Sequence, residues 1–297
     1  MVPDHTSQYK MLSETSRVAH RLYSRNNVYL QIGDQLESLL TPINLTKLDP
    51  ANRLTMESCI RLALVTAFQL EEALPDILAV KAVHGRVDWK YALDLPIEHL
   101  GITESDLCDF RIDLLASPPA LEELGLLLLS LENIGLFKGR SELALQPCVA
   151  MDLLSLINQL YTLQLALYES LTMIALNTPE WLVEYIPVDL YKRNSGKRFP
   201  VANITQEEWH AQAQLLGSDI SMLLNKLNQS NDRDLLHLEE IEVLRRLFNA
   251  NFSTQSGVLS LRTDIPANCI NFKYLKEVSY RQSPNFKNAQ NGAGRVT

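Results

Sequence analysis

The sequence predicts an all-α protein, a multi-helix bundle with two helical subdomains and a disordered basic C-terminal tail. Leucine is abundant, only 11 of 297 residues are glycine, and only 7% are aromatic. No long run alternates apolar and polar residues as a half-buried strand would. The length allows one large or two modest domains. We expect the boundaries at 1–140, 141–270 and 271–297.

The first subdomain is predicted to consist of leucine-rich helices separated by proline. Residues 1–12 are polar and are expected to be loose. The range Val28–Leu40 carries apolar residues on one helical face, and a loop follows it. A stronger helix is predicted to start at Thr55 and to be interrupted at Pro75, because its apolar residues are dense enough to be buried on most sides. A further buried helix is expected over Leu121–Leu131.

The stretch Val87–Arg111 is the most specific part of the sequence. Pro96 disfavours helical dihedral angles in the residue before it, so a first helix should stop there, and Gly101 lets the chain change direction. Thr103 or Ser105 can cap a second helix. The expected structural anchors are its apolar and aromatic residues, Trp89, Tyr91, Leu107 and Phe110. Spacing alone favours a helical corner over a DNA-recognition unit.

The second subdomain is predicted to centre on one long, buried helix. Apolar residues recur at three-, four- and seven-residue spacings from Leu153 to Ile174. The surrounding segment 141–191 has six acidic residues and no Lys or Arg. A capping-box pattern at Thr205 opens another helix, a short helical piece follows, and a last helix is expected over Leu235–Phe252.

Charge and cysteine content limit the possible functions. The net charge is −8 and the pI is about 5.3, so a nucleic-acid surface would have to be local. From Lys273 onward, five basic residues oppose one acid. None of the four cysteines lies in a CxxC motif or at metal-ligand spacing from a histidine, so we expect buried thiols and no metal or cofactor. With no signal peptide or membrane span, a cytoplasmic protein with no membrane partner is expected.

Several runs of residues resemble the N-terminal part of bacterial insertion-sequence DDE transposases with an InsH-type N-terminal domain. They include the runs VDWKYALDLP from Val87 and SDLCDFR from Ser105, together with Leu136-Phe137-Lys138-Gly139-Arg140. Further along, Thr178-Pro179-Glu180-Trp181-Leu182 is similar to the family's Ala-Pro-Asp-Trp-Leu. The resemblance implies a helical module that binds transposon ends.

The same resemblance implies that catalysis is lost. The family's first catalytic aspartate would fall at Gln146, and a neutral amide cannot supply the carboxylate that two-metal phosphoryl transfer needs. The family's later carboxylates would lie beyond Thr297, and Asp152 is interpreted as a charge near a helix N-terminus. No nucleotide-binding, HExxH or GxSxG motif indicates another enzyme. We therefore expect a transposase-like protein that is not an enzyme.

Two functions are compatible with this interpretation. In the first, the helical module binds transposon-end DNA or a transposase partner, and the candidate DNA contacts are the cations that the resemblance places there, Lys90, Arg111, Lys138 and Arg140. In the second, the chain is a repurposed protein–protein interaction scaffold that no longer binds DNA and that forms a helix-in-groove pair or a homodimer with itself through its leucine-rich, acidic region.

Overall fold

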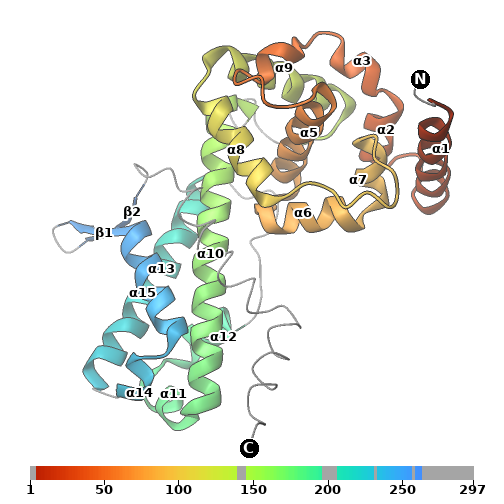
Figure 1. Cartoon of the computed structure of the whole chain (residues 1–297). Coiled ribbons are helices and arrows are strands. Elements are labelled where there is room, and N and C mark those ends of the chain that lie inside the picture. Colours follow the sequence, from red (N-terminus) through yellow and green to blue (C-terminus); the bar gives the residue numbers. More distant parts are fainter. Residues whose placement is uncertain (1–4, 139–144, 196–205, 231–232, 256–257, 263–297) are drawn as a thin grey trace, which may run out of the picture. The chain divides into compact units, whose positions relative to one another are not determined.

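A computed structural model describes residues 5–138, 145–195, 206–230, 233–255 and 258–262 (Figure 1). The fold is mostly helical, as the sequence predicts, with one small two-stranded sheet. The chain divides into two compact units, Met1–Leu154 and Ser155–Thr297. This division falls within helix α10, beyond the boundary expected at residue 140. The predicted tail, 271–297, lies outside the described residues.

The helices of the first unit are short to medium in length. They are α1 (His5–Leu22), α2 (Val28–Asp34), α3 (Leu36–Leu40), α4 (Leu45–Leu48), α5 (Met56–Glu72), α6 (Asp76–Gly85), α7 (Val87–Ala92), α8 (Glu104–Leu115) and α9 (Pro118–Ile134). Cap residues set several of these ends, because a side-chain oxygen can satisfy the free amide groups of a first turn. Thr55 accepts from the Ser58 N–H at the start of α5, and Ser117 accepts from the Ala120 N–H at the start of α9.

Three features of the first unit differ from the sequence prediction. Residues 5–12, which were predicted to be loose, form the first part of α1, and this helix packs on α7: Ala19 is fully buried, and the Thr15 hydroxyl donates to the Leu95 carbonyl over 3.0 Å. The single helix predicted over Val28–Leu40 is divided at Gln35 into α2 and α3. A short helix, α4, lies within the predicted loop.

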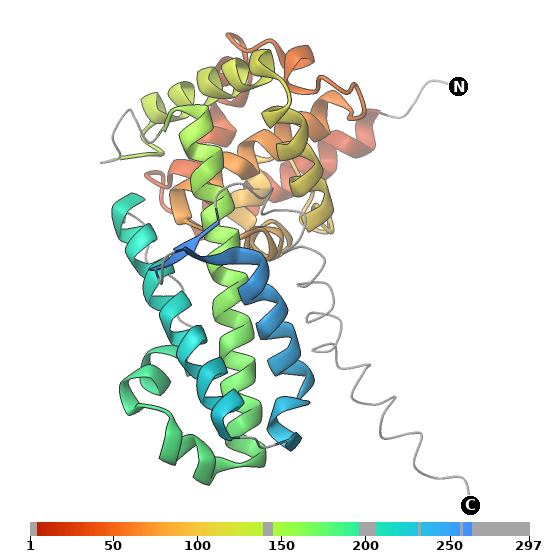
Figure 2. The ribbon, with the colours of Figure 1, turned by 90° about the vertical axis from the view of Figure 1, so that its left-hand side faces the viewer.

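The second unit contains the long helix α10 (Pro147–Asn177) from residue 155 onward. The remaining elements are α11 (Pro179–Tyr185), α12 (Val188–Asn194), α13 (Gln206–Ser230), α14 (Arg233–Leu236), α15 (Glu239–Asn251), β1 (Phe252–Gln255) and β2 (Val258–Leu261). The later turns of α10 run beside α13 and α15 in both views (Figures 1 and 2). The Ser170 hydroxyl of α10 donates to the Glu240 carbonyl over 3.1 Å. Leu160, Leu167 and Ile174 are buried, so the apolar face of α10 is covered within its own chain.

The second unit also corrects two predictions. The helical pieces expected around Trp209 and Ile220 form one continuous helix, α13. Its Gly217 lies against the strands, where a methyl group would overlap the Phe252 ring. The strands themselves were not predicted. They pair antiparallel, with Phe252 opposite Leu261 and Ser253 opposite Ser260.

The cysteines and the helix lengths bear on two further expectations. Cys59 and Cys108 are buried, as expected, and burial raises the pKa of the Cys59 thiol to about 12. Cys148 is exposed, so the expectation of a buried thiol was wrong at that position. Cys269 lies outside the described residues.

Within the described ranges, no single helix is long and apolar enough to cross a membrane; α8 and α9 together pass that test of length and composition, with a bend of 113° between them.

Gly33 allows α2 to lie against α7, and its replacement tests this packing. A Cβ atom at Gly33 would lie 2.7 Å from the Tyr91 ring and 3.2 Å from the Tyr91 carbonyl oxygen. We expect Gly33→Ala to destabilise the first unit by about 1–3 kcal/mol, because overpacking outweighs the gain in helix propensity. Urea unfolding measures this. Gly85→Ala is the matched control, since no neighbouring atom lies within 4 Å of its Cβ position, and equal losses in both variants would contradict the prediction.

Candidate functional site

The candidate site is the helical corner formed by α7, the turn after it and α8, which together cover Val87–Leu115. The first helix ends at Ala92, earlier than Pro96 alone predicts, because Asp94 already adopts a left-handed conformation (φ 50°). Gly101 is left-handed as well (φ 93°), as expected for a residue that redirects the chain. Thr103 caps α8 through a reciprocal capping box with Asp106. The sequence left Thr103 and Ser105 open, and the structure selects Thr103.

Trp89 forms the aromatic centre of the corner. Its side chain is fully buried, with ring centroids 5.1 Å from that of Phe68 in α5 and 5.8 Å from that of Tyr29 in α2. The Tyr29 and Phe68 centroids lie 4.9 Å apart, with their rings nearly perpendicular. Tilted and edge-to-face pairs of this kind stabilise a core beyond simple burial. One residue from the corner therefore holds together three helices that are distant in sequence.

A charged network centred on Arg86 covers this aromatic cluster. Its guanidinium donates over 2.6 Å to each Glu72 carboxylate oxygen, and over 3.1 and 2.8 Å to the two Asp88 oxygens. The Arg86 Cζ atom also lies 4.9 Å from the Trp89 ring centroid and 5.0 Å from that of Tyr29. Sequence reasoning missed this network. Arg86 lies one residue before the recognisable run, and its partner Glu72 belongs to another helix.

The network fixes the ionisation of Asp88. Burial raises the pKa of the Asp88 carboxyl group, but its hydrogen bonds to Arg86 and the positive charge of Arg86 outweigh burial, so the pKa lies below its usual range. The Trp89 N–H also donates to Asp88 over 3.0 Å, and the Asn27 side chain donates over 3.4 Å. Asp88 thus joins the start of α7 to the cap of α2.

The lowered pKa of Asp88 predicts an acid-sensitive contribution to stability. A carboxyl group with a folded-state pKa below its unfolded value, about 3.9, stabilises the fold above that value, and the contribution is lost as the pH falls through the folded-state pKa. We expect Asp88→Asn to be less stable than wild type at pH 7 and to lose less stability on acidification. Urea unfolding at a series of pH values measures both effects. Asp109→Asn, on the exposed face of α8, is the control and should keep the wild-type dependence of stability on pH. If its stability depends on pH as weakly as that of Asp88→Asn, the assignment to Asp88 is wrong.

Lys90 closes the turn of the corner from inside the protein. Only 3% of Lys90 is exposed, and its Nζ atom donates to the Ile97 carbonyl over 2.5 Å and to the His99 carbonyl over 2.6 Å. Burial lowers the pKa of the Lys90 amine. Arg61 of α5 holds the other side of the turn by donating to the Leu93 and Asp94 carbonyls. Lys90 is therefore not the exposed cation that a contact with DNA requires, and its role here is to position the turn.

Arg111 is also buried. It is fully inaccessible and forms an ion pair with Asp76 at the start of α6, and the Gln69 side chain donates to the same carboxylate over 2.9 Å. Leu107 and Phe110, on the same helix, are buried as well, whereas Tyr91 is partly exposed and donates from its hydroxyl to Asp34 over 2.6 Å. Arg111 thus ties α8 to α6 and is removed from the set of exposed cations for the same reason as Lys90.

The outer face of α8 is acidic and apolar. Its exposed side chains are those of Asp106, Asp109, Ile112 and Leu115. Asp113 beside them is partly exposed and forms an ion pair with Arg53. Phosphate is repelled by a surface of this sign. The outer face of α8, the second helix of the corner, therefore does not have the charge that DNA recognition needs.

The remaining predicted positions lie near the start of α10. Lys138 is exposed, Arg140 lies outside the described residues, and Gln146 is exposed just before α10. Asp152 is exposed on the second turn of that helix. In the described parts of the chain, no group of three or more His, Cys, Asp or Glu side chains is placed to hold a metal ion. The described residues therefore do not assemble a carboxylate site around Gln146.

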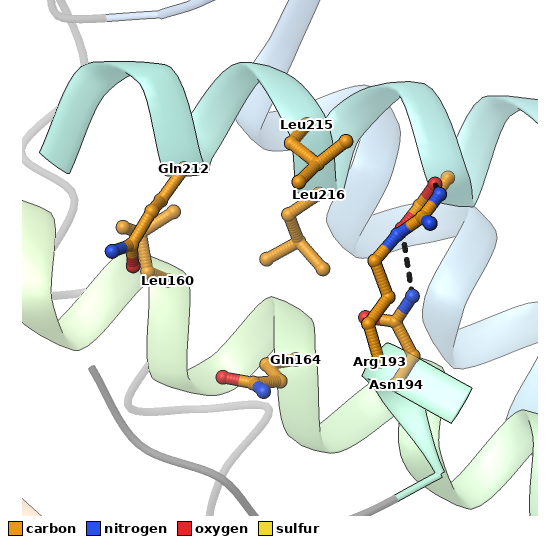
Figure 3. A pocket seen from close by; sticks show the side chains of 8 residues that line it. Leu160, Gln164, Arg193, Asn194, Gln212, Leu215 and Leu216 are labelled. Carbon is orange, nitrogen blue, oxygen red and sulfur yellow. Dashed lines mark hydrogen bonds and ion pairs between the residues drawn. The ribbon is translucent and has the colours of Figure 1, made fainter. Parts of the chain in front are cut away.

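A small cavity of about 200 Å³ lies within the second unit (Figure 3). Its walls come from α10, α12 and α13, and its lining residues are Leu160, Gln164, Arg193, Asn194, Gln212, Leu215, Leu216 and Asp219. Asp219 is buried and accepts from Arg193 over 2.7 and 2.5 Å and from the Asn194 amide over 2.7 Å. The cavity is smaller than most ligand sites. Because the charged groups satisfy one another, this cluster serves to join α12 to α13.

Comparison of the chain with protein-family models, with curated proteins and with solved structures finds no match.

Proposed function

We propose that this chain is a transposase-like protein that binds transposon-end DNA through its first unit and does not cleave it. The observation that carries the proposal is the packing of the corner formed by α7, the turn and α8. The two runs of residues that resemble the transposase family fold into one packed unit, in which Trp89, Leu107 and Phe110 lie in the core. A helical unit with a packed core can present surface residues to DNA in a fixed geometry.

The chemistry of the Gln146 position supports binding without cleavage. Its side chain is a neutral amide, and the described residues place no cluster of carboxylates that would hold the metal ions of phosphoryl transfer. The same proposal gives Lys90 and Arg111 structural roles, because Lys90 binds a backbone carbonyl and Arg111 pairs with Asp76 inside the first unit. Of the expected DNA contacts, Lys138 remains exposed and is kept in the proposal.

A mobility-shift experiment tests the proposed function. The full chain is titrated against a duplex that carries the terminal inverted repeats of an insertion sequence of this type, and against a scrambled duplex of equal length. We expect a salt-sensitive shift with preference for the repeats, and no strand cleavage on addition of Mg²⁺. The proposal is wrong if the folded chain shifts neither duplex at low salt, and Mg²⁺-dependent cleavage would overturn its non-catalytic part.

A second candidate function, binding of a protein partner, is favoured by the surface of α8. Ile112 and Leu115 are 38% and 46% exposed on the same face as Asp106 and Asp109. Exposed apolar residues flanked by acids suit a protein surface better than a phosphate backbone. The leucine-rich helix α10 supports this function less, because its apolar face is covered by its own unit. Light scattering of the wild type and of an Ile112→Ser, Leu115→Ser variant tests this candidate, and a strict wild-type monomer would count against self-association.

A further inference from the structure

Three exposed cations of the first unit lie close together in sequence on helix α1 and the turn that follows it. Arg17 and Arg21 are four residues apart on α1, and Arg25 lies in the turn before α2. All three are exposed. We call these three side chains the α1 arginine face.

The packing of α1 determines the direction in which this face points. Thr15 and Ala19 are buried and lie on the side of α1 that contacts α7. A rotation of about 100° per residue places Arg17 and Arg21 on the opposite side of the helix. The turn is held by hydrogen bonds, since the Asn27 N–H donates to the Ser24 carbonyl over 3.0 Å and the Gln31 side chain donates to the Arg25 carbonyl over 3.3 Å. The backbone that carries the α1 arginine face is therefore held in place, and the side chains of Arg17 and Arg21 point away from α7.

Most other cations of the first unit are neutralised or engaged. Lys47 pairs with Glu123, Arg53 with Asp113, and Arg86 with Glu72 and Asp88. Among the described residues, by contrast, no ion pair involves Arg21 or Arg25. Arg17 meets Glu14 over 3.8 Å, with both side chains more than 60% exposed, which makes a weak pair. Lys81 and Lys138 are exposed as well, but the α1 arginine face groups three exposed cations within nine residues of this acidic chain.

We propose that the α1 arginine face contacts the phosphate backbone of duplex DNA. This inference rests on the proposed function and names the surface that carries it. Guanidinium groups pair with phosphate through two parallel hydrogen bonds. Arg17 and Arg21 start about 6 Å apart along the helix axis, so they can reach separate phosphates. The contact is independent of sequence, positions the protein on the duplex and leaves the acidic face of α8 turned to another partner or to solvent.

The experiment measures how binding depends on salt. Fluorescence anisotropy gives the affinity of the full chain for a mixed-sequence duplex at several salt concentrations. Each phosphate contact contributes about −0.9 to the slope of log K against log salt, so the variant Arg17→Gln, Arg21→Gln, Arg25→Gln should lose about 2 to 3 from the magnitude of that slope. A control with the same change in charge, Lys81→Gln, Lys192→Gln, Arg246→Gln, replaces exposed cations elsewhere and should keep the wild-type slope.

The possible outcomes separate this inference from the proposed function. If the wild type binds and the arginine variant keeps its affinity and slope, the α1 arginine face is not the DNA surface, and the proposed function stands. If the control loses as much as the arginine variant, the effect is general charge and the inference also fails. If the wild type does not bind, both proposals fail. Polyglutamate serves as a competitor, and binding to it as tight as to DNA would assign the face to acidic proteins instead.

Discussion

Replacing Trp89 by alanine is expected to lower the free energy of unfolding of the first unit by about 3–5 kcal/mol. Trp89 is fully buried, and its ring contacts Phe68 of α5, Tyr29 of α2 and the guanidinium of Arg86. Alanine would leave a cavity at the point where these elements meet. Among the described residues, the Trp89 indole nitrogen has no hydrogen-bond partner, so we expect the loss to come from packing and ring contacts.

A pair of variants checks this expectation. Trp89→Phe keeps an aromatic ring and removes the unpartnered indole N–H, so it should lose clearly less stability than Trp89→Ala. Tyr91→Phe, on the same helix but partly exposed, removes a hydroxyl that donates to Asp34 and should cost about 1 kcal/mol. Urea unfolding followed by circular dichroism measures all three. A loss below about 1 kcal/mol for Trp89→Ala would show that Trp89 is not the anchor of the corner.

Local signals in the sequence predict much of the helical framework. Caps and proline breaks placed the start of α5 after Thr55 and the start of α8 near Thr103, because these signals act through the nearest backbone amides. Elements that depend on distant packing were missed. Helix α1 packs on α7, and the strands cover Gly217 of α13, so neither the burial of α1 nor the fit at Gly217 can be judged from the local sequence. Local patterns contain no information about such partners.

The same distinction applies to the candidate site. The apolar anchors Trp89, Leu107 and Phe110 could be selected from the sequence, because large apolar residues at helical spacing are usually buried. The burial of Lys90 and Arg111 could not, since charged residues are almost always exposed unless they are paired. Arg111 meets a carboxylate 35 residues earlier in the chain, and Lys90 meets backbone carbonyls that only the turn brings together. Sequence reasoning consequently assigned to DNA two cations that stabilise the fold.

The pair formed by Asp76 and Arg111 provides the second large effect. Asp76→Ala should destabilise the first unit by about 3–5 kcal/mol, because it leaves the fully buried Arg111 charge without its carboxylate. The Gln69 side chain, which donates to Asp76, would lose an acceptor as well. Among the described residues, the Arg111 Nε and Nη1 atoms are buried without a hydrogen-bond partner, so no described acceptor would replace the lost carboxylate. Urea unfolding measures the loss.

Removing both charges together distinguishes an ion pair from simple packing. The double variant Asp76→Leu, Arg111→Met replaces the pair by apolar side chains of similar size and should be considerably more stable than Asp76→Ala, because no charge is left buried. If the double variant is as unstable as Asp76→Ala, the two side chains stabilise the first unit through their packing and not through their charges, and the prediction is wrong. The double variant also bears on DNA binding. Since Arg111 is inaccessible, a folded double variant should bind a DNA duplex as the wild type does, and a selective loss of binding would return Arg111 to the set of DNA contacts.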